Sequence, residues 1–209
     1  MIGATGLIGA GIAERLNAQG ATFGSLARRA SGQSVETVAE PARWPELAEA
    51  WAPDIAISAL GTTMRAAGSQ AAFRAVDFDM VVNFARGAFA GGARQMITIS
   101  SVGAGGGASN FYLGVKSEME AALGEIGFTR LDILRPGLLR GARGGDRRIA
   151  ERVGIAISPV LNLVLRGRFD RFAAIDADKV AAAVVALTRE TAPGRFVHHN
   201  RELGALARA

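Results

Sequence analysis

The chain has 209 residues, 49% of them hydrophobic and 21% charged, which suits one well-packed domain. It has no cysteine, which excludes disulfides and thiolate chemistry, and its two histidines, His198 and His199, are adjacent and make a poor ligand set, so no metal is expected. The net charge of +5 comes mostly from scattered arginines without a base-reading motif, so we expect no nucleic acid partner. Without a secretory signal or an apolar run of roughly 18 residues, the sequence predicts a soluble, cytoplasmic protein with no membrane span.

Strand and helix patterns alternate along the chain, separated by glycine-rich turns and proline breaks. In chain order, we expect a turn at 3–9, a helix ending at Gly20, strands at 22–27 and 34–38, a helix at 46–51, a strand at 55–60, a helix at 71–89, a strand at 95–100, a helix at 110–123, a strand at 130–134 and a helix at 178–189. The apolar strands lack period-two alternation, as buried parallel strands do. This pattern predicts an α/β, Rossmann-type, doubly wound parallel sheet.

Both ends of this predicted domain depart from the usual layout. Only Met1 and Ile2 precede the first glycine, whereas a strand usually has about five residues, so the first strand is expected to be truncated. Of a short strand and a chain that lacks residues before Met1, we favour the second, because a missing central strand would expose two edges. Residues 1–209 are assigned to one NAD(P)-binding domain, in which 137–176 and 193–209 shape a small substrate region. The apolar run 155–165 would be a core helix, a lid or a partner surface, in that order of preference.

The glycines of the first turn have the spacing of a phosphate-binding turn. Glycine lets backbone amides approach a pyrophosphate, whose negative charge is favoured at the N-terminus of the following helix. In a sequence with 27 glycines, the alternative is that this segment is only a turn. The candidate cofactor-binding residues here are Gly3, Thr5, Gly6, Leu7, Ile8 and Gly9.

Arg28 and Arg29 stand at the end of the next strand, where an NAD-selective site has an acidic residue for the ribose hydroxyls. A guanidinium there would pair with a 2′-phosphate, so NADP (NADPH) is favoured over NAD as the cofactor. Arg28 is preferred because it follows Ala27 directly and should still be held by the strand. The alternative is that one or both arginines are solvated loop charges.

Tyr112 and Lys116 are four residues apart on a predicted helix and therefore share one face. A nearby ammonium favours phenolate, so the phenol could give a proton to a carbonyl as hydride arrives. The alternative is a surface pair of no consequence. Upstream, the apolar strand 97–101 ends in two serines, and ligands of parallel sheets bind at the carboxyl ends of strands. We choose Ser101 over Ser100, because alternation turns only one of them toward the cleft.

The chain resembles the short-chain dehydrogenase/reductase superfamily in the order of four segments. These are the glycine turn at 3–9, the strand end at Ser100 and Ser101, the helix from Tyr112 to Lys116, and the segment Arg135 to Gly137. The form of the first turn is similar to the extended or atypical branch of that superfamily. More narrowly, the chain resembles the Tat-interacting-protein group of NAD(P)H-binding oxidoreductases and their bacterial relatives. The segments that carry the narrower resemblance are Ala59 to Thr63, Ile99 to Ser101, Asn110 to Glu118 and Leu134 to Gly137.

The resemblance implies a Rossmann fold, NADPH preference, and a catalytic set of Ser101, Tyr112 and Lys116. It also implies that Lys116 binds the nicotinamide ribose and that Leu60 or Gly61 lines the cofactor, with Pro136 as a further cofactor-binding candidate. Members often add an asparagine to the proton relay. Asn83 is on the appropriate helix, although a capping or buried role is an equal alternative.

Three functions compete at this point. The first is an NADPH-dependent reductase of a carbonyl or sugar-like small-molecule substrate. The second is a dinucleotide-sensing regulatory or scaffold protein with little catalysis. The third is a helix-mediated oligomer, such as a homodimer, whose Rossmann core is structural. The identity of the substrate does not follow from the sequence, because fold does not fix function.

Overall fold

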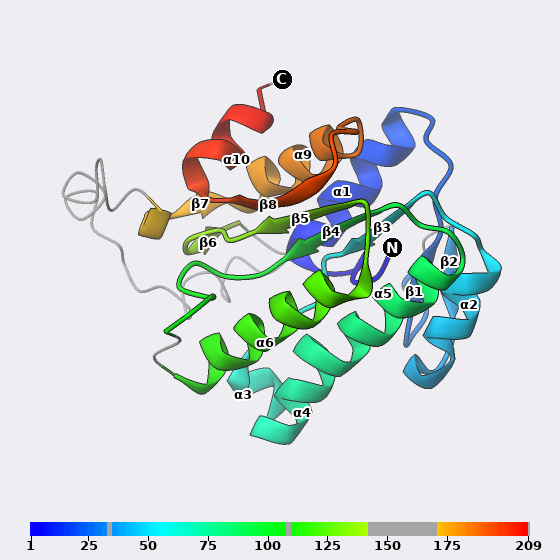
Figure 1. Cartoon of the computed structure of the whole chain (residues 1–209), viewed down its shortest axis with the longest axis horizontal. Coiled ribbons are helices and arrows are strands. Elements are labelled where there is room, and N and C mark those ends of the chain that lie inside the picture. Colours follow the sequence, from blue (N-terminus) through cyan, green and yellow to red (C-terminus); the bar gives the residue numbers. More distant parts are fainter. Residues whose placement is uncertain (33–34, 108–109, 142–170, 209) are drawn as a thin grey trace.

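Parallel strands form the centre of the molecule, as seen in a computed structural model that describes residues 1–32, 35–107, 110–141 and 171–208 (Figure 1). One part of the sheet has the order β1-β2 and the other β3-β4-β5-β8, and every pair is parallel. These strands are β1 (Ser25–Ala27), β2 (Glu36–Val38), β3 (Ile55–Ser58), β4 (Gln95–Ile99), β5 (Arg130–Leu134) and β8 (Gly194–His198). The predicted α/β fold with a parallel sheet is confirmed.

Ile2 joins the two parts of the sheet. It forms parallel bridges with Leu26 on one side and Ser58 on the other. The Leu26 N–H donates to the Met1 carbonyl at 2.9 Å, and the Ile2 N–H donates to the carbonyl of Ile57 at 2.9 Å. The short segment Met1–Ile2 therefore fills the place between β1 and β3, and both neighbouring strands find hydrogen-bonding partners at this point.

Helices cover both faces of the sheet, as Figure 1 shows. One face carries α1 (Leu7–Ala18), α9 (Ala177–Leu187) and α10 (Asn200–Leu206), whose apolar side chains form one core cluster. The other face carries α2 (Trp44–Ala50), α5 (Met80–Ala90) and α6 (Phe111–Ile126), which enclose a second cluster. The strands β3, β4 and β5 each contribute apolar side chains to both clusters, which is why their apolar residues do not alternate with polar ones.

The helix predicted over 71–89 forms as one helical run over 70–90 that contains a π-helical turn. The chain forms α3 (Met64–Ala67) and α4 (Gln70–Arg74), passes through a π-helical turn over Ala75–Asp79, and then continues as α5. A 3-10 turn over Pro41–Arg43 likewise precedes α2. Hydroxyl caps explain the start of the two short helices, because Thr63 and Ser69 each accept a hydrogen bond from the backbone N–H three residues later. π-Helical turns inside helices are frequent at functional sites.

The segment 193–209, which was expected to shape the substrate region, also supplies an edge strand of the sheet. Gly194–His198 pairs with β5 as strand β8, which the sequence analysis missed because this run is short and carries arginine and histidine. Within the expected substrate region, β6 (Leu139–Arg140) pairs in parallel with β7 (Ile175–Asp176). The run 155–165 lies outside the described residues. Among the described helices, none is long and apolar enough to cross a bilayer.

Candidate functional site

The glycine turn is fixed by contacts too close for a side chain. Gly3 has φ +80°, and a Cβ there would lie 2.5 Å from the backbone of Ala59 and Leu60. A Cβ on Gly9 would lie 2.0 Å from the Gly3 carbonyl oxygen. Gly6, the residue before α1, has ordinary dihedral angles, and its nearest neighbour would be 3.4 Å away. Gly3 and Gly9 are therefore required by the turn itself, whereas a Cβ on Gly6 would make only ordinary contacts with the carbonyl oxygens of Gly3 and Ala59.

A pocket of about 230 Å³ opens beside this turn. It lies where the turn, the end of β1 and the loop after β3 meet, with α2 contributing one wall. Within the part of the chain that the structure describes, neither Arg28 nor Arg29 forms an ion pair, and both are exposed. The lining residues are Gly3, Ala4, Thr5, Leu26, Ala27, Arg28, Arg29, Trp44 and Leu60.

This combination fits the adenosine end of a dinucleotide. Trp44, Leu26 and Leu60 supply apolar walls, the guanidinium groups supply positive charge, and the N-terminus of α1 supplies backbone donors. Of the predicted cofactor residues, Gly3, Thr5, Arg28, Arg29 and Leu60 meet here. Gly6 is the N-cap residue of α1, and Leu7, Ile8 and Gly9 form its first turn.

Lys116 reaches from α6 to the carboxyl ends of β3 and β4. Its Nζ lies 2.7 Å from Oδ1 of Asp77 and 3.4 Å from the carbonyl oxygen of Ile99. A Cβ placed on Gly61 would be 3.8 Å from the same nitrogen. Since the other side of this loop, at Leu60, contacts the glycine turn, the structure brings the predicted cofactor turn and the predicted lysine to one segment.

The two serines after β4 have different surroundings. Ser100 is buried, and its Oγ donates to Oε1 of Glu120 at 2.5 Å. Ser101 is half-buried, and its Oγ makes a longer contact of 3.3 Å with the Val102 carbonyl oxygen. The Val102 N–H donates to the carbonyl of Pro136, so the predicted cofactor residue Pro136 is buried beside this turn. Ser101 thus keeps the more accessible hydroxyl at the strand end.

Tyr112 lies in the first turn of α6. The helix begins there because the side chain of Asn110 accepts a hydrogen bond from the Leu113 N–H at 2.9 Å. The half-buried phenol ring packs against buried Phe73 of α4, with ring centroids 5.4 Å apart. The loop after Ser101 also lies on α6, because Gly105 donates its N–H to the Ser117 hydroxyl. The ring contact recorded for Tyr112 among the described residues is thus with α4.

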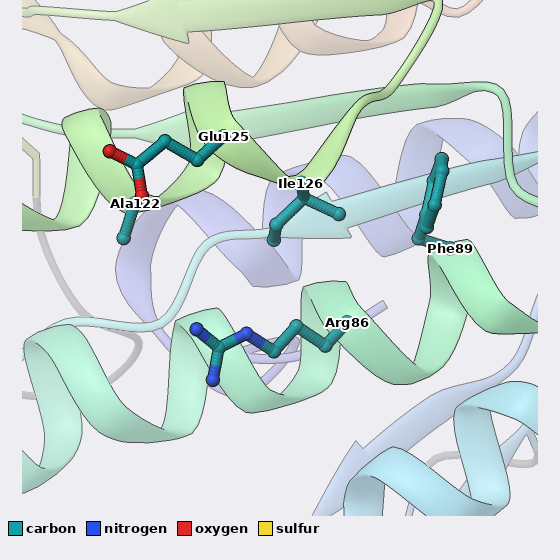
Figure 2. A pocket seen from close by; sticks show the side chains of 5 residues that line it. All are labelled: Arg86, Phe89, Ala122, Glu125 and Ile126. Carbon is teal, nitrogen blue, oxygen red and sulfur yellow. The ribbon is translucent and has the colours of Figure 1, made fainter.

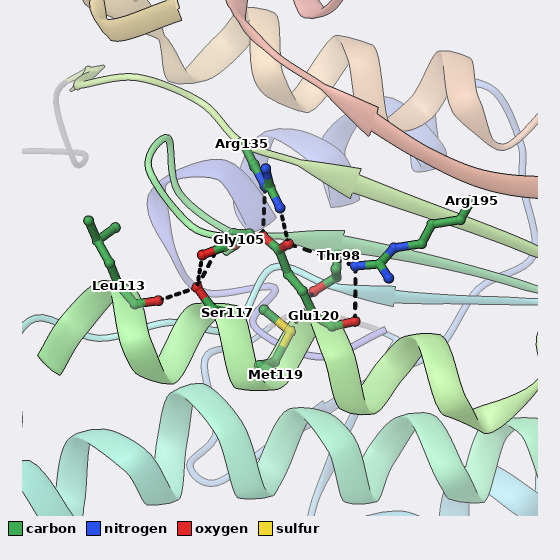
Figure 3. Close-up of polar contacts among 9 residues, drawn as sticks. Thr98, Gly105, Leu113, Ser117, Met119, Glu120, Arg135 and Arg195 are labelled. Carbon is green, nitrogen blue, oxygen red and sulfur yellow. Dashed lines mark hydrogen bonds and ion pairs between the residues drawn. The ribbon is translucent and has the colours of Figure 1, made fainter. Parts of the chain in front are cut away.

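A buried carboxylate behind Ser100 was not recognised in the sequence. Glu120 accepts hydrogen bonds from Ser100 and from the guanidinium of Arg135, whose Nε lies at 2.9 Å (Figure 3). Arg195 of β8 lies 4.0 Å from the same carboxylate. The helical spacing of Glu120 from Lys116 was a usable signal, since both must lie on the buried face of α6.

The asparagine considered for the proton relay is elsewhere. Asn83 is exposed on α5, and the polar side chain that approaches Lys116 is Asp77 of the π-helical turn. Asp77 was not predicted, although its spacing of four residues from the apolar Phe73 and Val81 was a usable signal that it lies on the buried face of this helix.

A second buried charge cluster surrounds Asp132 in the middle of β5. Burial alone would raise the pKa of this carboxyl group, but hydrogen bonds from His198, Arg130 and Gln95 outweigh burial and hold the pKa below its usual value. The neighbouring His199 has a lowered pKa, because burial and the nearby Arg135 disfavour its charged form. His198 is thus part of the hydrogen-bond network around Asp132, and His199 lies partly buried near Arg135.

Comparisons with known proteins place these observations in a family, although no family model matches the chain. The Scheffersomyces stipitis "Protein FMP52-1, mitochondrial" is 32% identical over 172 residues, covering 78% of this chain and 76% of that protein. The Rattus norvegicus "Protein HTATIP2" is 44% identical over 86 residues, or 41% of this chain and 35% of that protein. The resemblance to the Tat-interacting-protein group is thereby confirmed.

Solved structures show the same fold. The human epimerase family protein SDR39U1, crystallised with NADPH, has a TM-score of 0.66 at 18% identity and covers 95% of this chain and 72% of its own. MoeE5 in complex with UDP-glucose and NAD has a TM-score of 0.69 at 15% identity, covering 99% of this chain and 79% of its own. Both NADPH and NAD therefore occur among these neighbours.

One sequence-based prediction is overturned by the comparisons. The chain was expected to be cytoplasmic, but the curated FMP52 relatives from several fungi are named mitochondrial proteins. The prediction was wrong because it rested on the absence of recognisable signals, which carries no information about where relatives reside.

Proposed function

This chain belongs to the family of the FMP52 proteins, and we propose that it is an NADPH-dependent reductase of the short-chain dehydrogenase/reductase superfamily that acts on a carbonyl or sugar-like substrate. The observation that carries the proposal is the continuity from the glycine-turn pocket, through Leu60 and Gly61, to the ammonium of Lys116. A dinucleotide lying along this path would have its adenosine beside Arg28 and its nicotinamide ribose beside Lys116.

The chemistry assigned to the protein is proton transfer. When bound, NADPH supplies the hydride that reduces a carbonyl carbon and leaves as NADP⁺. Tyr112 gives its phenolic proton to the carbonyl oxygen, so that the product is an alcohol, and Ser101 donates a hydrogen bond to the same oxygen. Lys116 stabilises the phenolate left behind through its positive charge.

Preference for NADPH over NADH is assigned to Arg28, with Arg29 beside it. Both guanidinium groups border the pocket and are exposed, so they are available for a 2′-phosphate. A guanidinium forms charge-assisted hydrogen bonds with that phosphate. Its hydrogen bonds with the uncharged ribose hydroxyl groups of NADH would be weaker. The preference for NADPH is therefore expected to depend mainly on the charge of Arg28, directly after β1.

The test measures binding of NADPH and NADH to the full chain, followed by NADPH consumption over a panel of carbonyl substrates. Arg28→Ala should weaken NADPH binding about tenfold and leave NADH binding unchanged, since a charge-assisted hydrogen bond contributes about 1.5–3 kcal/mol. Arg94→Ala is the matched control, because Arg94 is exposed and its contact with Asp54 is 3.9 Å long. Tyr112→Phe should abolish turnover without loss of NADPH binding.

Two results would count against this function. Failure to bind either dinucleotide would contradict the whole proposal. Tight NADPH binding without turnover of any substrate, unchanged by Tyr112→Phe, would instead favour a dinucleotide-sensing protein with little catalysis.

We also propose that the chain forms a homodimer through α5 and α6. A pocket of about 370 Å³ lies between these helices, and Figure 2 shows Arg86 and Phe89 on α5 facing Glu125 and Ile126 on α6. Phe89 is 40% exposed. A twofold interface needs a self-complementary patch, and this one carries both charges and apolar surface. Sizing in solution tests it: Phe89→Arg should convert a dimer to a monomer, whereas a monomeric wild type would contradict it.

A further inference from the structure

We propose that Asp77 is the positioning residue for Lys116, holding its ammonium at the place where the nicotinamide ribose of the dinucleotide would lie. This inference rests on the proposed function. It concerns Asp77 of the π-helical turn, which none of the sequence motifs includes.

The geometry around the pair is specific. Asp77 Oδ1 lies 2.7 Å from Nζ of Lys116, and the other oxygen accepts the Thr62 N–H at 2.8 Å. The side chains of Asp77 and Lys116 are 1% and 5% exposed, respectively. One carboxylate therefore joins three segments, namely the π-helical turn, the loop after β3 and helix α6.

The carboxylate has a physical task here. A buried ammonium without a counter-charge is poorly solvated, so a flexible lysine side chain turns it toward water. That response would remove the fixed positive charge from the end of β4. Asp77 prevents it, because it supplies a negative charge from a side chain whose own orientation is fixed by the Thr62 amide.

The ammonium also keeps a donor for a ligand. Lys116 has three N–H donors, of which one meets Asp77 and a second points to the Ile99 carbonyl oxygen at 3.4 Å. Gly61 stands next to the pair, where a Cβ would lie 3.4 Å from Asp77 Oδ1 and 3.8 Å from Nζ. This glycine leaves room through which a ribose hydroxyl could reach the remaining donor.

Helical spacing explains how an acid reaches this position. Asp77 lies four residues after buried Phe73 and four residues before buried Val81, so it is on the buried face of the helix. Asp79 belongs to the same π-helical turn, Ala75–Asp79, but is exposed.

The experiment is a double-mutant cycle read out as NADPH dissociation constants of the full chain. Its variants are Asp77→Asn, Lys116→Met and the pair combined, and Asp178→Asn is the control because it removes the same charge from an exposed ion pair with Arg15. Asp77→Asn should weaken NADPH binding roughly tenfold and add nothing in the Lys116→Met background. Asp178→Asn should bind NADPH as the wild type does.

Folding is checked by circular dichroism before binding is measured. If Asp77→Asn does not fold, Asp77→Glu replaces it, since it keeps the charge but displaces the carboxylate by one methylene. That variant should weaken NADPH binding by a smaller factor, which again disappears in the Lys116→Met background.

Each remaining result decides the question. Wild-type affinity in the Asp77 variant, or an equal loss in both backgrounds, would overturn the positioning role and leave the proposed function standing, because a merely structural carboxylate would act independently of Lys116. A wild-type chain that binds neither NADPH nor NADH would overturn the proposed function and this inference together.

Discussion

Two neighbouring regions at the carboxyl edge of the sheet are held in place by opposite means. The glycine turn depends on atoms that are missing: a Cβ on Gly3 or Gly9 would collide with backbone at 2.5 Å or 2.0 Å. The region between β4, β5 and α6 depends on buried charges, with Glu120 bound to Ser100 and Arg135, and Lys116 bound to Asp77. One region is sterically determined within a few residues, and the other is determined by ion pairs between distant segments.

The difference has consequences for mutation. A steric constraint is violated by any added atom, and the chain around it must move. A buried ion pair is violated by removing either partner, because the remaining charge is left without a counter-charge in a poorly solvated place. The two regions should therefore respond to different substitutions, and by different amounts.

The largest effect is expected from Glu120→Ala. It leaves the Arg135 guanidinium and the Ser100 hydroxyl without their buried acceptor, and should lower the free energy of unfolding by about 3–5 kcal/mol. Glu118→Ala is the control on the same helix, because Glu118 pairs with Arg74 at the surface and should cost at most about 1 kcal/mol. Urea unfolding of both variants measures the contrast. Equal losses would show that the buried network has no special weight.

Gly9→Ala is expected to come next. Its Cβ cannot coexist with the Gly3 carbonyl oxygen, so the turn must shift, at a cost of about 1–3 kcal/mol in the free energy of unfolding. Gly6→Ala has room, with a nearest neighbour at 3.4 Å, and should change stability by less than about 1 kcal/mol. Under the proposed function, Gly6→Ala should nevertheless weaken NADPH binding, because it adds a methyl group to the N-cap residue of α1, where the pyrophosphate is expected to bind. Thermal unfolding and NADPH titration separate the two effects.

A smaller loss of stability is expected when the pH is lowered, because acid protonates Asp132 without removing any side chain from its cluster. The folded-state pKa of Asp132 is lowered, so the unfolded chain takes up the proton first as the pH falls below about 4. The stability contributed by this carboxylate is thus complete above that pH and is lost as the pH falls through the lower folded value. Urea unfolding between pH 5 and pH 3 should show a steeper loss for the wild type than for Asp132→Asn. Parallel curves would exclude this role for Asp132.

The same contrast explains what the sequence could predict. The glycine turn, the strand ends and Tyr112 to Lys116 are local patterns whose spacing carries their geometry, and the parallel sheet follows from apolar strands between helices. Asp77 and Glu120 escaped prediction because their partners are 39 and 15 residues away, on other elements. Strand β8 escaped because its place beside β5 depends on pairing across 64 residues, as from Arg130 to Gly194, that no local pattern records.

The smallest effect offers the sharpest control on the glycine argument. Gly114 lies in α6 between Tyr112 and Lys116, and a Cβ there would meet nothing within 4 Å. Gly114→Ala should therefore raise the free energy of unfolding by about 0.5–1 kcal/mol, because alanine loses less backbone entropy than glycine in a helix. The same substitution destabilises at Gly9, so the sign of the change should report whether space is present. Thermal unfolding of the two variants side by side measures it, and a destabilised Gly114→Ala would mean that α6 needs glycine for a close approach, such as that of a second subunit.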